Sequence, residues 1–492
     1  MKSHLFLIIS LILSKSILCF AQWGPDVRLT YNNFNCLTTP NSGRSIVCDT
    51  AGFLHVIWVQ TPKYSWKGSL WYMRYRGFWE TPVQLTDSTV TGSASYSFTA
   101  ATNNLGGMLV VWTDVRVSGN FEIYCRTSTD GGTNWNPEER LTNAPGGSES
   151  PSMAALGTTF HVVWLDRRDG PTGQVYYKKR VGGTWSQDTA LTAQTDTLNG
   201  PTVACDSTGR VFVAWWKVRN RKGELWFKRF NGISWEPGVR LSQDTLLIDF
   251  SPYLPSLAVK GNGEIHLFWD SGDEEIHYRR SPDGGASWGP DVRLTYDPAE
   301  SWWPSGAIGP GGRVQVVWAD GRTNGRGDIF FKESMDDGQS WSPDSQLTTD
   351  SSESWCPSLA VDPRGGLHVV WADSRDTVFQ VYYKSRTPLG IEKDSTLFEQ
   401  LSFNLFQSAP NPWVSATRIS YTLPREAKVL LRVYNPVGQL VRSLVDCNES
   451  AGYKQVTWDG RDDCGRRVPS GVYFYRLQAG SFSDTKKMVL IR

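Results

Sequence analysis

Short apolar segments alternate with glycine-bearing turns along most of the chain, and the same kinds of segment return in the same order. One kind is an apolar run that ends in tryptophan, at Trp58, Trp112, Trp164, Trp215, Trp269, Trp318 and Trp371. Each run is followed by a segment of alternating aromatic and polar side chains, at 70–75, 121–126, 174–179, 224–229, 275–280, 328–333 and 380–385. Alternation with a period of two, bounded by glycine, predicts β-strands.

A third kind of segment begins with Trp and ends in Leu-Thr or Leu-Ser. Its copies occupy 23–30, 79–86, 135–142, 185–192, 235–242, 288–295 and 341–348, and the leucine advances by 56, 56, 50, 50, 53 and 53 residues. A Pro-Ser stretch such as 255–260 adds a strand ahead of the Trp-ending run. Four short strands per period of about 50 residues are typical of a β-propeller blade. The turns of a linear β-solenoid are too short and too uniform to match.

The repeats are out of phase at the two ends of this region. The last repeat, which ends near residue 390, lacks a segment of the third kind, whereas the copy at 23–30 has no repeat before it. An open sheet edge promotes aggregation and ring closure removes it. The sequence therefore predicts an all-β fold in which 22–388 form a seven-bladed β-propeller closed by an N-terminal outer strand. The partners of that strand should lie around Val381 to Tyr383.

The ends of the chain predict its processing. Lys2, the apolar run that follows it and a small residue at Ala21 are typical of a signal peptide over 1–21. No later segment has the ~18 apolar residues of a spanning helix, so we expect no transmembrane anchor in the mature chain. We place a linker at 389–402. These features predict a secreted or cell-surface protein.

Charge and cysteine usage exclude some partners. The 50 Lys and Arg residues balance the 49 Asp and Glu residues, so no basic field favours nucleic acid. The cysteines show no Cys-x-x-Cys spacing, and we expect no metal site and no cofactor. Cys447 and Cys464 flank one predicted hairpin and form a candidate disulfide.

Three turns between the alternating segment and the Trp-to-Leu segment share the pattern Ser-x-Asp-x-Gly-x-x-Trp, at 128–135, 281–288 and 334–341. They resemble the Asp-boxes of sialidase-like (BNR-repeat) propellers, in which this motif is structural, so the resemblance implies a scaffold role for Asp130, Asp283 and Asp336. WD repeats, at about 40–45 residues, are too short, and kelch repeats match only loosely. Cleaving sialidases carry a proline in their first arginine motif and have six blades. The region 42–49 (SGRSIVCD) lacks that proline and this chain counts seven repeats, so the resemblance supports the scaffold and not sialidase activity.

Residues 403–492 have a different pattern. The alternation around Tyr473 and Tyr475 by itself predicts a β-sandwich. The Pro-Asn-Pro entry near 411, the Gly-x-Tyr-x-Tyr strand and the Lys-Lys-Met-Val-Leu ending resemble an FlgD-type immunoglobulin-like domain, as found in C-terminal sorting domains of the type IX secretion system. That resemblance implies bacterial outer-membrane export, with the secretion machinery as a partner.

The order of the four strands in each repeat predicts where the candidate site lies. The second-to-third strand connections share one face of the ring with the crossovers between blades, opposite the Asp-box turns. On that face the pairs Asp114/Arg116, Asp166/Arg168, Asp320/Arg322 and Asp373/Arg375 follow the strand tryptophans, and the crossovers add Trp302, Trp303 and Trp355. Two interpretations of the pairs stay open. They form structural ion pairs, or they form a polar ring whose arginines bind carboxylates or sulfates.

Two repeats depart from this pattern. The fourth carries Lys217 and Arg219 after its tryptophan, and the fifth carries Asp270 and Asp273. Because glycoside hydrolysis needs two carboxylates at a set distance, Asp270 and Asp273 are the catalytic candidates, although acidic loops are usually only solvated. A packing role is favoured over metal binding for the recurring histidines at 55, 161 and 368.

Three functions remain open at this point. The preferred hypothesis is a non-catalytic propeller that binds glycan or another surface ligand. The alternatives are a sialidase-like glycoside hydrolase or lyase, and an architectural or adhesin module.

Overall fold

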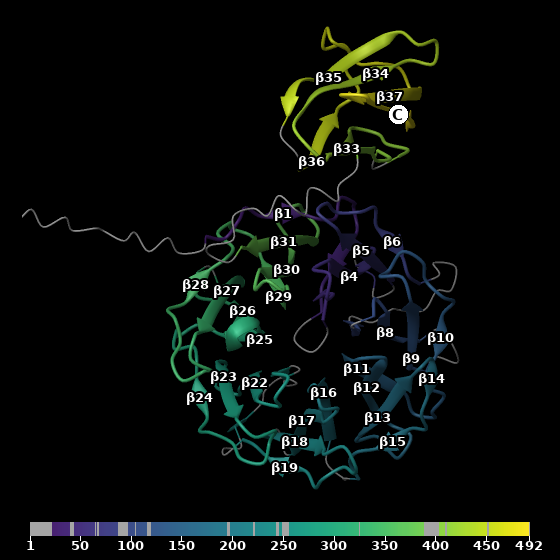
Figure 1. Cartoon of the computed structure of the whole chain (residues 1–492). Helices are drawn as coiled ribbons and strands as arrows, with labels where there is room; N and C mark the ends of the chain where they lie inside the picture. Colours follow the sequence, from purple (N-terminus) through teal and green to yellow (C-terminus); the bar gives the residue numbers. More distant parts are fainter. Residues whose placement is uncertain are drawn as a thin grey trace, which may run out of the picture.

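The computed structural model shows an all-β protein (Figure 1). It describes residues 22–39, 44–63, 65, 68–86, 97–103, 105–115, 120–193, 197–219, 222–242, 246–247, 255–323, 325–387, 403–408, 411–449 and 452–491. The predicted signal peptide and the whole of the predicted linker lie outside these residues. No helix of the described chain is both long enough and apolar enough to cross a membrane.

The residues before 388 form antiparallel sheets that surround a central opening (Figure 1). Sheet 1 contains β2 (Asn35–Leu37), β3 (Ile46–Cys48), β4 (Leu54–Thr61), β5 (Ser69–Tyr75) and β6 (Val83–Gln84). Sheet 2 contains β7 (Phe98–Thr102), β8 (Met108–Asp114), β9 (Glu122–Ser128) and β10 (Glu139–Arg140). Sheet 3 contains β11 (Ser148–Leu156), β12 (Thr159–Asp166), β13 (Gln174–Val181), β14 (Thr184–Trp185) and β15 (Thr189–Ala190). Sheet 4 contains β16 (Thr197–Cys205), β17 (Val211–Arg219), β18 (Lys222–Phe230), β19 (Val239–Arg240) and β20 (Leu246–Leu247). Sheet 5 contains β21 (Ser256–Val259), β22 (Ile265–Asp270), β23 (Ile276–Ser281) and β24 (Val292–Arg293). Sheet 6 contains β25 (Ser301–Ile308), β26 (Val314–Asp320), β27 (Asp328–Ser334) and β28 (Ser345–Gln346), and a 3₁₀ turn at Pro310–Gly312 joins β25 to β26. Sheet 7 contains β29 (Ser354–Val361), β30 (Leu367–Asp373), β31 (Gln380–Arg386) and β1 (Val27–Arg28).

The N-terminal strand β1 lies in sheet 7, beside β31 (Figure 1). Val27 is paired with Tyr383 and Arg28 with Tyr382, so the partners predicted from the phase of the repeats are confirmed. Leu29 is buried and joins a cluster with Val56 of sheet 1 and Val370 of sheet 7. The two ends of the region are therefore joined by hydrogen bonds and by apolar packing.

The repeated Leu-Thr or Leu-Ser ending has a structural cause. In every copy the hydroxyl oxygen of the Thr or Ser accepts a hydrogen bond from a third-strand backbone N–H of the same sheet. The acceptors are Thr30, Thr86, Thr142, Thr192, Ser242, Thr295 and Thr348, at 2.8–3.1 Å. The outermost strands have only two residues in most sheets, and these hydroxyls extend the pairing beyond them.

Serines of the Pro-Ser stretches join neighbouring sheets around the opening. Ser152 accepts a hydrogen bond from the backbone N–H of Val203 at 3.2 Å, and Ser305 accepts one from Leu359 at 3.1 Å. Ser256 and Ser358 make the equivalent contacts with Gly306 and Ile46. The contact between Ser358 and Ile46 joins sheet 7 to sheet 1, so it supplies a second closure, on the inner side of the ring.

The three Ser-x-Asp-x-Gly-x-x-Trp turns share one geometry. Asp130 Oδ1 accepts hydrogen bonds from the Asn134 backbone N–H at 2.8 Å and from Ser128 Oγ at 2.8 Å. The hydrogen bonds to Asn134 hold the pKa of Asp130 at about 2. Trp135 packs edge-on against Tyr72 of the preceding sheet, at 5.1 Å between ring centroids. Asp283 and Asp336 make the equivalent bonds, so the three carboxylates are held in turn structure.

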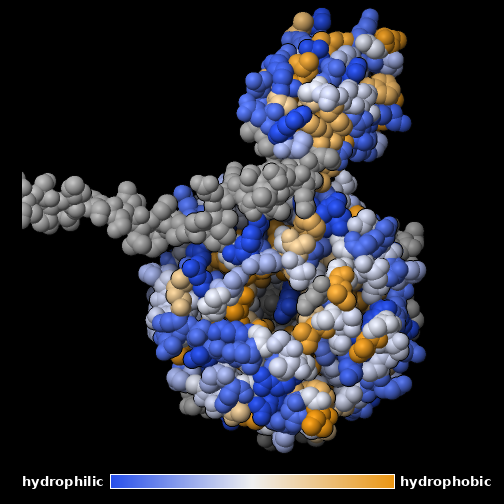
Figure 2. Space-filling model, in the orientation of Figure 1, coloured by the Kyte–Doolittle hydropathy of each residue, from blue (hydrophilic) through white to orange (hydrophobic). Residues whose placement is uncertain are grey.

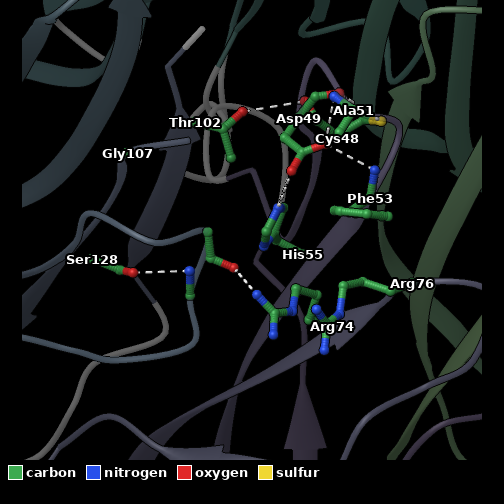
Figure 3. A network of polar contacts seen from close by, with 12 residues as sticks. Cys48, Asp49, Ala51, Phe53, His55, Arg74, Arg76, Thr102, Gly107 and Ser128 are labelled. Atoms are coloured by element: carbon green, nitrogen blue, oxygen red, sulfur yellow. Dashed lines mark hydrogen bonds and ion pairs between the residues drawn. The ribbon is translucent and has the colours of Figure 1, made fainter. Parts of the chain in front are cut away.

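The recurring histidines are packing groups, buried at 55, 161 and 266 and partly buried at 368. His55 Nδ1 lies 2.8 Å from Tyr72 Oη. Its Nε2 lies 3.4 Å from Asp49 Oδ2, and Asp49 Oδ1 accepts hydrogen bonds from the backbone N–H groups of Ala51 and Phe53 (Figure 3). His161, His266 and His368 make the same contact with a tyrosine hydroxyl at 2.8 Å. Burial lowers the pKa of His161 and His266 to about 4, so both are neutral at physiological pH.

The C-terminal region forms two sheets. One contains β32 (Asn404–Leu405), β33 (Thr417–Leu423) and β36 (Gly452–Trp458), and the other contains β34 (Ala427–Tyr434), β35 (Leu440–Glu449), β37 (Gly471–Ala479) and β38 (Phe482–Leu490). Their shared core includes Trp413, Trp458 and Tyr475. This is the β-sandwich that the alternation predicted.

The candidate disulfide between Cys447 and Cys464 is wrong, because both thiols are free and exposed. The turn that carries Cys464 contacts β35 at Val441 and Ser443. Cys447 lies four residues further along that strand, about 13 Å away at the rise of a β-strand. A disulfide joins Cα atoms less than about 7 Å apart.

Candidate functional site

One face of the ring, here called the crossover face, carries both the connections after the strand tryptophans and the crossovers between sheets. The backbone joins the two sets directly. Gly321 N–H donates to the carbonyl of Glu300 at 2.9 Å, and Ser374 N–H donates to that of Glu353 at 3.0 Å. The Asp-x-Arg pairs and the crossover tryptophans therefore share this face, as the sequence predicted.

The aspartates of the pairs are enclosed. Asp320 is fully buried and accepts hydrogen bonds from Trp318 Nε1 at 2.9 Å and from Ser301 Oγ at 3.1 Å. Asp166 and Asp373 have the same two kinds of partner. Burial by itself raises the pKa of Asp373, but the hydrogen bonds from Arg375 and Trp371 outweigh burial and hold this pKa below its usual value.

Each described arginine of the pairs is held on several sides. Arg322 Nε and Nη2 donate to Asp320 at 2.8 and 2.6 Å, and its Nη1 donates to Asp344, which directly precedes β28, at 2.7 Å. Its guanidinium lies over the Phe330 ring, 4.4 Å from the centroid. Lys332 closes the network with an ion pair to Asp344 at 2.8 Å.

The same network recurs in sheets 3 and 7. There Asp188 and Asp26 take the place of Asp344 and bind Arg168 and Arg375 at 2.9 Å. Asp26 directly precedes the N-terminal strand β1. The ion pairs of Arg375 and Lys384 with Asp26 therefore join the N-terminal segment to sheet 7. The sequence left open whether the Asp-x-Arg pairs form structural ion pairs or a ligand-binding polar ring. In sheets 3, 6 and 7 they form ion pairs.

The remaining members of this predicted set are placed differently. Asp114 accepts a hydrogen bond from Trp112 Nε1 at 3.3 Å, and Arg116 lies outside the described residues. The Lys217 ammonium lies 5.3 Å from the Trp226 ring centroid. The side chain of Arg219 is also outside the described part.

Sheet 5 lacks the Asp-x-Arg pair. Asp270 directly follows Trp269, so it occupies the position of Ala319 and not that of Asp320. Asp270 is buried, and one of its oxygens accepts the backbone N–H of Trp303 at 3.2 Å. The other oxygen, Oδ1, is buried without a hydrogen-bond partner among the described residues. Burial raises the pKa of Asp270 to about 7.

Asp273 lies in an ion-pair group that the sequence reasoning missed. His277 lies 2.7 Å from Asp291 and 3.2 Å from Asp273. Burial by itself lowers the pKa of His277, but hydrogen bonds to Asp273 and Asp291 raise it to about 9. A signal was present in the sequence, because His277 occupies the strand position at which sheets 3, 6 and 7 have Tyr176, Phe330 and Tyr382. The two catalytic candidates therefore differ, since one is a buried acid and the other a paired carboxylate.

The three crossover tryptophans lie together. Ring centroids of Trp302 and Trp303 are 6.2 Å apart, and those of Trp303 and Trp355 are 6.0 Å apart. All three are partly exposed. Trp303 and Cys356 have φ values of 56° and 51°, and each precedes a proline. Backbone in this strained region is common at binding sites.

Comparison with known proteins supports the architecture. Residues 413–482 form an FlgD Ig-like domain, and no curated protein matches the sequence of this chain. A polysaccharide lyase, an ulvan lyase, is similar in structure over 73% of this chain and 95% of its own, at 12% identity and a TM-score of 0.51. A Hadza microbial sialidase matches over 68% and 77% at 16% identity (TM-score 0.43), and Trypanosoma rangeli sialidase over 80% and 84% at 10% identity (TM-score 0.40). These likenesses concern the fold alone.

Proposed function

We propose that the protein is a secreted or cell-surface propeller of seven blades that binds carbohydrate on its crossover face without cleaving it. Residues 22–388 supply the binding ring. The FlgD Ig-like domain would act within 403–492 as the sorting signal for type IX secretion, after removal of residues 1–21. The tryptophan group of Trp302, Trp303 and Trp355 is the observation that carries the binding proposal.

Partly exposed indole rings combine an apolar face with a polar edge, which suits stacking on sugar rings. Contacts with neighbouring residues hold the tryptophan group in place. Trp355 Nε1 donates to the carbonyl of Arg326 at 2.9 Å, and its ring centroid lies 5.1 Å from that of Phe379. A preorganised aromatic surface loses little conformational entropy on binding.

The surrounding carboxylates favour binding over cleavage. Asp166, Asp320 and Asp373 are each saturated by an arginine and a tryptophan. A carboxylate in such a pair is a poor general acid or nucleophile, and glycoside hydrolysis needs two carboxyl groups that reach the sugar.

Replacing Trp355 with alanine tests the proposed surface. We expect at least a tenfold loss of affinity for the polysaccharides that the wild type binds, because one stacking face is removed. Ulvan is the first probe, since the matched polysaccharide lyase is named for it, and isothermal titration calorimetry measures the affinity. The control is Ile233→Ala, at a side chain that is 90% exposed and lies outside the tryptophan group. Equal affinities of Trp355→Ala and the wild type would contradict the proposed surface.

A glycoside hydrolase or lyase is the second candidate, and Asp270 is the observation that favours it. A carboxyl with a pKa near 7 suits a general acid, and neighbouring groups with pKa values pushed apart mark an acid and base pair. Asp273, whose pKa is lowered, would be the partner. Release of reducing or unsaturated ends from a polysaccharide panel, abolished in Asp270→Asn, would establish this function and exclude the binding-only proposal.

A further inference from the structure

The Ig-like domain contacts the propeller where the ring closes. The guanidinium of Arg418, in β33, lies over the Tyr31 ring at 3.6 Å from its centroid. The Phe406 ring, directly after β32, lies 4.4 Å from the ring of Phe78. In Figure 1 the domain lies beside β1, β31 and β5, and the space-filling view in Figure 2 shows it at the same edge of the ring.

The two contacts reach different parts of the closure. Tyr31 lies three residues after β1, in the N-terminal segment that completes sheet 7. Phe78 lies in the turn that follows β5 of sheet 1. The Ig-like domain therefore bridges the N-terminal segment and sheet 1.

A lysine or arginine on the third strand joins sheets 2 to 7 each to the sheet before it. Its side chain donates a hydrogen bond to the carbonyl of the leucine in the Leu-Thr or Leu-Ser ending of that preceding sheet. The pairs are Arg126–Leu85, Lys178–Leu141, Lys228–Leu191, Arg279–Leu241, Lys332–Leu294 and Lys384–Leu347. In sheet 1 the equivalent residue is Met73, which pairs with Val56 as Lys332 pairs with Val316.

The junction between the N-terminal segment and sheet 1 therefore lacks this contact. Met73 and Leu29 pack in one apolar cluster, but a thioether has no proton to donate to the Leu29 carbonyl. Hydrogen bonds from charged donors are about twice as strong as those between neutral groups. On the side of sheet 1, the closing segment is thus held by apolar packing where the other fourth strands also have a charged hydrogen bond.

We propose that the Ig-like domain is a clamp on the ring, which docks on a surface formed by Tyr31 and Phe78 and holds the N-terminal segment against sheet 1. Its two contacts join the same two parts of the chain that a cation at position 73 would join. The partner of this surface is the face of the chain's own Ig-like domain that carries Phe406 and Arg418. The C-terminal domain then stabilises the propeller, whether or not the propeller binds carbohydrate.

The repeated nine-residue segment provides a matched comparison within the chain. Residues 23–31 and 288–296 have the same sequence, and in each copy the arginine lies against the tyrosine ring, at 4.7 and 5.2 Å from the centroid. Only the first tyrosine is also contacted by Arg418 among the described residues. Tyr31 is 46% exposed and Tyr296 is 73% exposed. Tyr296 is therefore the control position for the clamp.

Hydrogen exchange measured by mass spectrometry on the full mature chain tests the clamp. Arg418→Ala should speed exchange of the amides in 24–30 and in β31 about two- to fivefold, the range expected for loss of one cation–π contact at a partly exposed site. The amide of Val381 in β31 donates to Thr30, so faster exchange there reports opening of the closure and not a local change around Arg418. Exchange in 288–294 should not change.

A double-mutant comparison separates the clamp from other roles of the tyrosine. Arg418→Ala should add little to the exchange rates in a Tyr31→Ala background, because its contact is already absent. In a Tyr296→Ala background it should keep its full effect. Equal effects of Arg418→Ala in the two backgrounds, or unchanged exchange of β31 in Arg418→Ala alone, would overturn the proposal.

Met73→Lys supplies the missing donor. In this background Arg418→Ala should speed exchange less than it does in the wild type, and an undiminished effect would show that the clamp does not replace the missing cation. If Met73→Lys does not fold, Met73→Gln replaces it, since a glutamine amide also donates and is close to methionine in size. Trp355→Ala should leave exchange in β31 unchanged, so this proposal and the proposed carbohydrate binding fail separately.

Discussion

Deleting residues 22–31 should lower the Tm of the mature protein by roughly 10 °C, from a loss on the order of 5 kcal/mol. The deletion removes β1 and the buried Leu29, exposes the edge of β31, and leaves Arg375 and Lys384 without their Asp26 partner. Differential scanning calorimetry measures the effect. We also expect the truncated protein to unfold over a wider temperature range, because the ring is no longer closed on its outer side.

Two controls accompany the deletion. A variant that keeps the length of 22–31 with its sequence scrambled should behave like the deletion. A synthetic peptide of residues 22–31, added to the truncated protein, should recover part of the lost stability. A truncated protein that melts like the full-length chain would show that the N-terminal strand does not close the ring.

The second large effect is expected at Asp320. Replacing it with asparagine removes the carboxylate from Arg322, Trp318 and Ser301. Breaking a buried ion pair at one partner costs about 3–5 kcal/mol, since the other charge stays behind. Denaturant unfolding should show this loss, and a loss below about 1 kcal/mol would contradict the described network.

Asp270 provides a contrasting control. It is a buried carboxylate of sheet 5 that occupies the position of Ala319, one residue before that of Asp320, and no arginine is among its described hydrogen-bond partners. Its raised pKa means that the folded state holds the proton more tightly than the unfolded state between about pH 4 and pH 7. Its contribution to stability is therefore complete below about pH 4 and is lost as the pH rises to 7. Asp270→Asn should unfold like the wild type near pH 4 and be at least as stable at pH 8. A loss at pH 8 as large as that of Asp320→Asn would contradict this pKa.

The repeat carried most of the fold information. Strand alternation and the Trp-to-Leu spacing predicted the meanders, and the missing last strand predicted the pairing of Val27 with Tyr383. The structural role of the Leu-Thr ending was not predicted. The repeat shows that the Thr or Ser recurs, but the sequence does not show which backbone N–H its hydroxyl oxygen accepts.

The site was less predictable. Asp-x-Arg has the same spacing whether the arginine turns back to its own aspartate or outward to a ligand, and only the side-chain geometry of Arg322 decides this. Arg44 lies in the region 42–49 that was compared with the first arginine motif of cleaving sialidases, but it was not named as a binding residue. The cavity that it lines is formed by the inner strands of seven sheets, which no local pattern around 42–49 reveals.

Binding and turnover measured in one sample test the proposed function most sharply. The mature wild-type protein is titrated with a panel of polysaccharides that includes ulvan, and the same mixtures are then analysed for chain length and new chain ends. A propeller that binds carbohydrate without cleaving it should show saturable binding with no change in chain length. Shortened chains would contradict the non-catalytic proposal, and no binding to any member of the panel would contradict the carbohydrate ligand.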